Sequence, residues 1–164
     1  MGKIQRCCRF IEQNDIRLLA DSPCYKYELL LSAALGTRPL LGEILSLHDR
    51  ILSQSGGSPG IRDFGGIASA IAQPRVSIDG DDAYPSLIEK AAVLGFALSQ
   101  NHGFIDGNKR IAHAAIETFL ILNGFEITAS VDEQESAVLQ LADGTLSRES
   151  LITWLENHVT ATTT

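Results

Sequence analysis

The chain has 164 residues and a formal net charge of −7; 45% of its residues are hydrophobic and 20% are charged. This length and balance predict one globular domain with its own core and exclude an intrinsically disordered chain. The acidic balance argues against general nucleic-acid binding, which needs a basic surface, although it allows a local basic pocket.

The three cysteines, Cys7, Cys8 and Cys24, all lie near the start of the chain. The adjacent pair lacks the second pair of ligands that a zinc site needs, so we expect reduced thiols. The first residues contain no apolar core of secretory length, and the apolar run at 28–36 is too short to span a bilayer. We therefore expect a cytoplasmic protein without a membrane partner.

Residues 1–38 differ from the rest of the chain and are expected to form an N-terminal extension of undefined role. A helix is predicted from about Tyr25 to Leu35, because Gly36 follows it as a C-terminal stop. A domain is then expected over residues 39–158, and residues 159–164 are expected to be a frayed tail.

The first half of this domain alternates helical spacing with turn residues. A helix is predicted to begin near Leu41 and to stop at Gly56–Gly57. A short helix around 67–71 ends before Pro74. Residues 75–79 are predicted to be a short strand or extended flap, and the following "DGDDA" (79–83) a loop. The apolar positions of the first helix are Leu41, Ile44, Leu45, His48, Ile51 and Leu52.

Two helices with different amphipathicity are predicted next. Pro85 suits the first turn of a helix that ends near Asn101 and is apolar on nearly all sides, so this helix should be central and buried. Another helix is predicted to follow Asn108 and to stop at Asn123–Gly124.

The last part of the domain predicts a short strand and two more helices. The strand is expected at 125–129. A capping box of Asp132 and Glu135 is predicted to begin a helix through Leu141, and Ser147 is predicted to cap the last helix. Together these elements predict an all-α bundle with one or two short extended pieces.

The stretch "HGFIDGNKR" (residues 102–110) places unusual polar chemistry directly before a helix. A helix start offers unpaired N–H groups and the positive end of the helix dipole. Gly107 lets the backbone approach a ligand closely, and Lys109 and Arg110 add positive charge. The pattern therefore predicts an anion site suited to phosphates, to which Asn108 can also hydrogen-bond.

Two further residues of this stretch indicate a reaction. Asp106 would repel phosphate oxygens unless a divalent cation lies between them, as Mg²⁺ does in many phosphate sites. His102 can take a proton from a hydroxyl group near neutral pH. Together these groups predict phosphoryl or nucleotidyl transfer to a hydroxyl. The plainer interpretation is a surface histidine beside a solvated basic turn.

The same stretch resembles the signature of the Doc branch of the Fic/Doc (Fido) family, His-x-Phe-x-Asp/Asn-Ala/Gly-Asn-Lys-Arg, at every specified position. Flanking segments such as "SLHDRILSQSGGSPGIRD" agree, so the resemblance covers roughly residues 40–157. It implies a Fido-type helical bundle with a short β-hairpin or flap, and ATP and Mg²⁺ as cofactors. It also implies the toxin of a toxin–antitoxin module.

The resemblance assigns roles to the motif residues. His102 matches the base that activates a hydroxyl of a target protein, and Asp106 matches the acid that coordinates Mg²⁺. Arg110 matches an arginine that contacts nucleotide phosphates. The implied catalytic residues are His102, Asp106, Lys109 and Arg110; the implied cofactor-binding residues are Gly107, Asn108, Lys109 and Arg110, and Phe104 is the buried aromatic that holds the loop.

Lys109 separates two reactions within this family. AMP-transferring members have glycine at this position, whereas the lysine form goes with transfer of the terminal phosphate of ATP. The implied target is a threonine of elongation factor Tu, and the implied outcome is arrest of translation. We therefore favour a protein kinase; the alternatives are AMP transfer and a catalytically weak Fido domain that acts as a binding or regulatory module.

Two departures concern the loop and its regulation. Gly103 replaces the proline of the AMP-transferring motif and is expected to loosen the loop. The self-inhibitory pattern Ser/Thr-x-x-x-Glu-Gly/Asn of some relatives is not found in the sequence, so a separate antitoxin is the expected partner.

Several other residues have alternative interpretations. Arg62 and Asp63 are expected to form a structural ion pair or cap rather than part of a site. His48 is expected to be a satisfied core histidine rather than a ligand. His113 is expected to border the face of the motif without a catalytic role, and residues 75–82 to form a flap that docks the target by strand addition.

Overall fold

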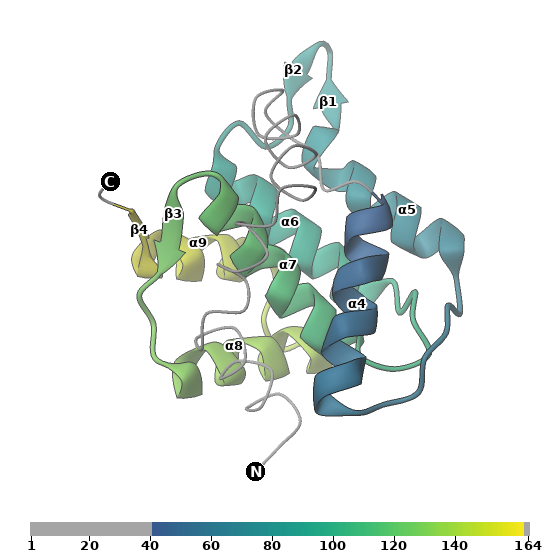
Figure 1. Ribbon diagram of the computed structural model, residues 1–164. Coiled ribbons are helices and arrows are strands. Elements are labelled where there is room, and N and C mark those ends of the chain that lie inside the picture. The colour runs from purple at the N-terminus through teal and green to yellow at the C-terminus, as the bar shows by residue number, and fades with distance from the viewer. Residues whose placement is uncertain (1–40, 163–164) are drawn as a thin grey trace.

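The computed structural model describes residues 41–162, which form a mainly helical unit with two small sheets (Figure 1). This confirms the predicted helical bundle with a short hairpin. The helix expected at Tyr25–Leu35 and the three cysteines lie outside the described residues. The helices are α4 (Leu41–Ser55), α5 (Phe64–Ala72), α6 (Leu87–Gln100), α7 (Asn108–Leu122), α8 (Val131–Asp143) and α9 (Arg148–His158); η1 (Gln73–Arg75) is a 3-10 turn, and the strands are β1 (Ser77–Ile78), β2 (Asp81–Asp82), β3 (Phe125–Ile127) and β4 (Val159–Ala161).

Helices α6 and α7 form the centre of the fold, with α4 and α5 packed on one side and α8 and α9 on the other (Figure 1). Ala91, Ala92 and Leu94 of α6 are fully buried, as its nearly uniform apolar surface predicts. A Cβ on Gly95 would lie 2.3 Å from Cγ1 of Ile116 on α7, so a glycine is required for the two helices to approach this closely. Within residues 41–162, no helix combines the length and apolarity needed to cross a membrane.

Serine side chains cap three of the helices, and two of these starts differ from expectation. Ser86 forms a capping box with Glu89, so Pro85 precedes the helix instead of lying in its first turn. Ser130 and Glu133 form the capping box of α8 in place of the predicted Asp132–Glu135 pair. In both cases the serine is the last residue with extended backbone before the helix, and its hydroxyl accepts from the N3 amide. Ser147 caps α9 as predicted.

A short hairpin follows α5 and projects from the helices (Figure 1). Its strands β1 and β2 are antiparallel, and Asp79 and Gly80 turn with positive φ between them. Part of the predicted loop 79–83 is therefore a strand. Lys90 of α6, whose side chain is 6% exposed, places Nζ 2.7 Å from Oδ2 of Asp82. This ion pair attaches the hairpin to the central helix.

The chain beyond α9 also forms a strand where a frayed tail was expected. Residues Val159–Ala161 pair antiparallel with β3, in a register that places Ile127 opposite Val159. The amide of Thr128 additionally donates to the carbonyl of His158 at 2.7 Å. The tail prediction is therefore wrong for residues 159–161, because β3 offers an unpaired edge that polar, threonine-rich sequence can complete.

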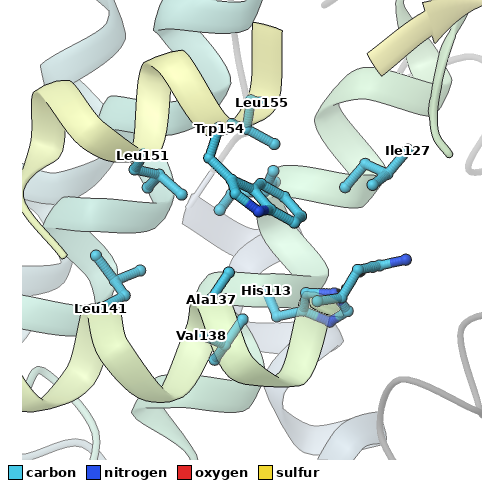
Figure 2. A pocket seen from close by; sticks show the side chains of 10 residues that line it. His113, Ile127, Ala137, Val138, Leu141, Leu151, Trp154 and Leu155 are labelled. Carbon is cyan, nitrogen blue, oxygen red and sulfur yellow. Dashed lines mark hydrogen bonds between the residues drawn. The ribbon is translucent and has the colours of Figure 1, made fainter. Parts of the chain in front are cut away.

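His113 of α7 is buried between α7, α8 and α9, beside a small apolar pocket that Leu151 and Trp154 also line (Figure 2). Its Nε2 donates to Oε1 of Gln134 at 2.8 Å, while Nε2 of Gln134 donates to the carbonyl of Ala129 at 2.9 Å. Because α7 is surrounded by other helices, this histidine bonds to α8 and lines a pocket shared with α9, whereas we expected it to border the motif face. Burial lowers the pKa of His113, and the hydrogen bond to Gln134 opposes this effect.

The buried His113 should make folding stability depend on pH. The unfolded chain binds a proton near the ordinary histidine pKa of 6.5, whereas the folded chain binds it only at lower pH. Stability should therefore decrease below pH 6.5, with a slope of at most about 1.4 kcal/mol per pH unit for this proton. Urea unfolding of wild type and His113→Gln between pH 7.5 and 5 measures this, and parallel stability profiles for the two proteins would contradict it.

Candidate functional site

The loop between α6 and α7 carries the predicted site residues, and backbone hydrogen bonds fix it to the segment before α5. The carbonyl of Gly103 accepts from the amides of Arg62 at 2.8 Å and Asp63 at 3.0 Å. The amide of Ile105 donates to the carbonyl of Gly60 at 3.0 Å. Three main-chain hydrogen bonds therefore join the loop to residues 60–63.

Gly103, which we expected to loosen the loop, lies where the loop packs closely against α5. A Cβ here would lie 2.4 Å from Cγ1 of Ile67 and 3.1 Å from the carbonyl oxygen of Asp63. The side chain of Ile67 packs directly on this position, so the glycine allows α5 to close on the loop. Asp63 occupies the N-cap position of α5 as predicted, although its side chain makes no capping hydrogen bond.

Phe104 and Asn108 lock the turn that leads into α7. Phe104 is fully buried, which confirms its predicted role as a core anchor. The Asn108 side chain accepts from the Phe104 amide at 3.0 Å and donates to the Phe104 carbonyl at 2.9 Å. Because the loop backbone uses both ends of this amide, the backbone N–H of Asn108, and not its side chain, is the group suited to a ligand.

The N-cap position of α7 is Gly107, with a φ of 84° and no side chain to satisfy the first amides of the helix. An asparagine or serine at this position would normally supply an acceptor for them. The helix start therefore presents N–H groups and the positive end of its dipole without an internal cap. Such a helix start is suited to an anion, so the geometry favours the anion site, which stays a prediction.

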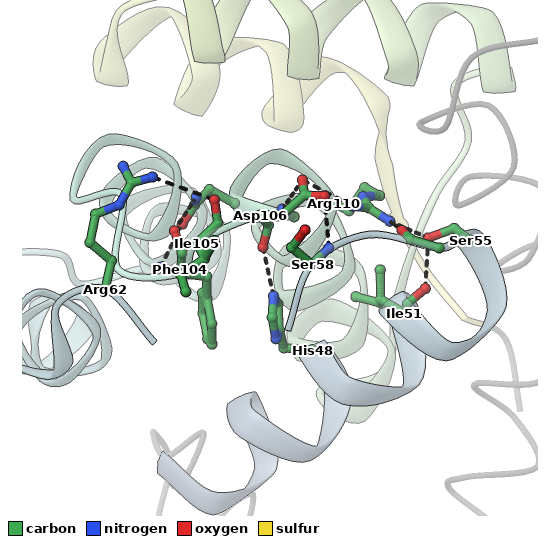
Figure 3. A network of polar contacts seen from close by, with 12 residues as sticks. His48, Ile51, Ser55, Ser58, Arg62, Phe104, Ile105, Asp106 and Arg110 are labelled. Atoms are coloured by element: carbon green, nitrogen blue, oxygen red, sulfur yellow. Dashed lines mark hydrogen bonds and ion pairs between the residues drawn. The ribbon is translucent and has the colours of Figure 1, made fainter. Parts of the chain in front are cut away.

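Asp106 lies next to this helix start and contacts protein groups through both carboxylate oxygens (Figure 3). Its Oδ1 accepts from the amide of Gly107 at 2.6 Å and lies 3.2 Å from Nη2 of Arg110. Its Oδ2 accepts from the amide of Ser58 at 3.3 Å. The side chain is nevertheless 38% exposed, so solvent reaches part of it.

Arg110 is buried beneath Asp106, with a residual exposure of 3%. Its Nη1 donates to the hydroxyl of Ser55 and, at 2.6 Å, to the carbonyl of Gly56, both at the C-terminal end of α4 (Figure 3). The sequence assigned this guanidinium to nucleotide phosphates. In the structure its observed donors go to protein acceptors, so it joins the end of α4 to Asp106.

His102 and Lys109 are the exposed members of the predicted set. His102 has a φ of 46°, in the left-handed region that residues other than glycine seldom adopt. Such strain persists where surrounding contacts determine the backbone, and it is frequent at functional sites. A solvent-accessible imidazole, a half-exposed carboxylate and an uncapped helix start thus lie within residues 102–107, in the loop that leads into α7.

Sequence reasoning missed the contribution of α4 and of the segment that follows it. His48, predicted to be a satisfied core residue, is indeed buried, but its hydrogen bond goes to the carbonyl of Asp106 at 2.8 Å. Gly57, taken as part of a helix stop, faces the carboxylate of Asp106. The adjacent Gly56–Gly57 pair was the available signal, because one glycine is sufficient to end a helix.

Comparison with known proteins gives a consistent result. Residues 40–120 match the model of the Fic/DOC family. Over 111 residues, the chain is 39% identical to "Toxin Doc" of Mycolicibacterium smegmatis (strain ATCC 700084 / mc(2)155). This alignment covers 66% of this chain and 85% of that protein. Over 109 residues, it is 30% identical to "Protein kinase doc" of Escherichia phage P1, with the same coverage of 66% and 85%.

Gly57 should be sterically required beside Asp106. A Cβ at this position, with a φ of 144°, would lie 2.6 Å from Oδ2 of Asp106 and 2.9 Å from Nη2 of Arg110. We expect Gly57→Ala to be less stable than Gly60→Ala by about 1–3 kcal/mol in urea unfolding. Gly60 is the matched control because its φ is 130° and its Cβ would meet only the side chain of Ile105, which is exposed. Equal losses for the two variants would contradict this steric role.

Proposed function

Because the chain belongs to the Fic/Doc family, we propose that it is a Doc-type toxin that transfers the terminal phosphate of ATP to a hydroxyl group of a target protein. One observation carries the proposal: His102, Asp106 and the uncapped start of α7 at Gly107 share one fixed loop. The names of the two relatives, a toxin and a protein kinase, support the same proposal.

His102 is the proposed general base. Its side chain is exposed, so the hydroxyl of a protein substrate can reach the imidazole. The hydroxyl oxygen attacks the terminal phosphorus of ATP and its proton passes to the imidazole. The bond between that phosphorus and the bridging oxygen breaks, and ADP leaves. Positioning of the hydroxyl in line with this bond accounts for much of such catalysis.

Asp106 is the proposed ligand of Mg²⁺. A carboxylate fits this role, because Mg²⁺ is commonly held by one or two carboxylates together with substrate phosphates. The side chain of Asp106 is partly exposed. The amides of Ser58 and Gly107 orient the carboxylate, and Arg110 balances part of its charge. When bound, the ion would neutralise charge on the phosphate oxygens.

The start of α7 is the proposed phosphate site. The amides of Asn108 and Lys109 belong to the first turn, where N–H groups have no partner within the helix. The side chain of Lys109 adds an exposed positive charge. Arg110 acts in this proposal mainly from beneath, through its contact with Asp106. These groups would hold the polyphosphate while His102 accepts the proton of the hydroxyl.

Lysine at position 109 is the reason to favour phosphate transfer over AMP transfer. The AMP-transferring motif of the family has glycine there, which leaves more room for the triphosphate at the helix start. By the same resemblance, we propose a threonine of elongation factor Tu as the acceptor, a separate antitoxin as the partner, and the cytoplasm as the compartment. The hairpin β1–β2 would dock the target chain by strand addition.

A labelled-nucleotide assay tests the reaction. With Mg²⁺ and ATP labelled at the terminal phosphate, the protein should label elongation factor Tu, and ATP labelled at the α-phosphate should give no label. His102→Ala should reduce labelling at least about 100-fold, as expected for loss of a general base. His158→Ala is the matched control and should keep full activity, because that side chain bonds to Trp154 on α9, apart from the loop.

The outcomes of this assay separate the alternatives. Label from the α-phosphate would replace phosphate transfer with AMP transfer. Label from neither position would support a catalytically weak binding module and refute both enzymatic proposals. Unchanged labelling by His102→Ala would remove this histidine from the reaction.

The hairpin should determine affinity for the protein substrate. Ile78 of β1 is 64% exposed and lies on the surface that the target would contact. We expect Ile78→Asp to raise the KM for the target protein about tenfold, with little change in kcat, because it alters binding but not the reacting groups. Leu139→Asp on α8 replaces another exposed apolar residue and should leave KM unchanged. A lowered kcat at constant KM would contradict the docking role.

A further inference from the structure

We propose that His48 is a positioning residue, which sets the orientation of the Asp106 carboxylate through the peptide group that links Asp106 to Gly107. This inference rests on the proposed function for its catalytic consequence. His48 belongs to α4, and its side chain is buried at 2% exposure, 58 residues from Asp106 in the sequence.

The imidazole of His48 makes a directional bond to the loop. Its Nε2 lies 2.8 Å from the carbonyl oxygen of Asp106, and a carbonyl can only accept, so Nε2 is the donor. The ring also stacks on Phe104, with centroids 3.8 Å apart and planes inclined by 18°. Figure 3 shows His48 beneath the loop and aimed at Asp106. The stacking on Phe104 therefore fixes the ring, and the hydrogen bond to the carbonyl of Asp106 fixes the loop.

A third contact places the same ring against Gly107. A Cβ on Gly107 would lie 3.1 Å from Nε2 of His48 and 3.5 Å from its Cδ2. The absence of a side chain at this position, together with its φ of 84°, allows the backbone to lie on the imidazole. His48 thus contacts positions 104, 106 and 107, which connect the proposed base to the proposed phosphate site.

The geometry of the peptide group carries the effect to the carboxylate. The carbonyl of Asp106 and the amide of Gly107 belong to one planar unit, in which the C=O and N–H point in opposite directions. His48 holds the oxygen at 2.8 Å, and the N–H donates to Oδ1 of Asp106 at 2.6 Å. Rotation of this plane would therefore break both bonds together. A donor on α4 in this way helps to orient the carboxylate, in addition to the direct contacts from Ser58 and Arg110.

Three substitutions of His48 separate the effect of its hydrogen-bond donor from the effect of its packing on Phe104. His48→Gln can place its amide nitrogen close to the position of Nε2 and keep the bond. His48→Asn is the matched variant, because its shorter amide reaches only the position of Nδ1. His48→Phe keeps the stacking on Phe104 and removes the donor. His113→Gln controls for loss of a buried histidine at a place outside the proposed machinery.

The first measurement needs no nucleotide. Amide hydrogen exchange of Gly107, followed by NMR in the protein alone, should accelerate about tenfold in His48→Phe and His48→Asn, because the peptide plane is released. His48→Gln and His113→Gln should exchange like wild type. If all three His48 variants exchange like wild type, the proposal is overturned. If His48→Phe fails to fold, the comparison of Gln with Asn gives the same test.

The second measurement is the transfer assay. We expect kcat to decrease about tenfold in His48→Asn, to return to within about threefold of wild type in His48→Gln, and KM for the target protein to stay constant. Equal kcat values for the Gln and Asn variants would refute the role of the donor. If wild type transfers no label, the proposed function fails while the exchange measurement still decides whether His48 orients the peptide.

Discussion

The candidate site depends on one buried charge. The guanidinium of Arg110 lies beneath the motif loop and donates to Ser55 and Gly56 at the end of α4 as well as to Asp106. A buried cation is costly unless its donors are paired, and the acceptors that pair it come from two separate segments of the chain. The end of α4 and the start of α7 are thereby fixed relative to each other. The position of the Asp106 carboxylate follows from this arrangement.

The groups of the loop divide into those that build it and those that remain accessible. Phe104, the side chain of Asn108 and the carbonyl of Gly103 are engaged within the protein, and they determine the path of the backbone. His102, Lys109 and one edge of Asp106 face outward. This division explains how a short, strained turn can present several polar groups reproducibly, because the contacts behind it, and not those in front, define its shape.

Much of the fold was predictable, because hydrophobic spacing locates helices well and α4, α6 and α7 have clear patterns and stops. Their exact starts were less predictable, since Ser86 and Ser130 compete with nearby residues that are also good caps. The motif loop could be identified from the sequence alone. The supporting groups of α4 and the turn after it could not, because His48 lies 58 residues away from Asp106 and only the tertiary structure makes His48 and Gly57 its neighbours. The strand β4 was missed for the same reason, as its partner β3 is distant in the sequence.

The backbone connections between residues 60–67 and the motif loop have a consequence for sequence drift. The carbonyl of Gly103 accepts hydrogen bonds from two amides of the neighbouring segment, and there is no room for a side chain on Gly103 beside Ile67. A side chain at 103 would have to displace both Ile67 and the carbonyl oxygen of Asp63, so a smaller residue at position 67 relieves only one of the two clashes. Position 103 is therefore limited to glycine by the main chain as well as by a neighbouring side chain, and a compensating replacement at 67 alone does not release it.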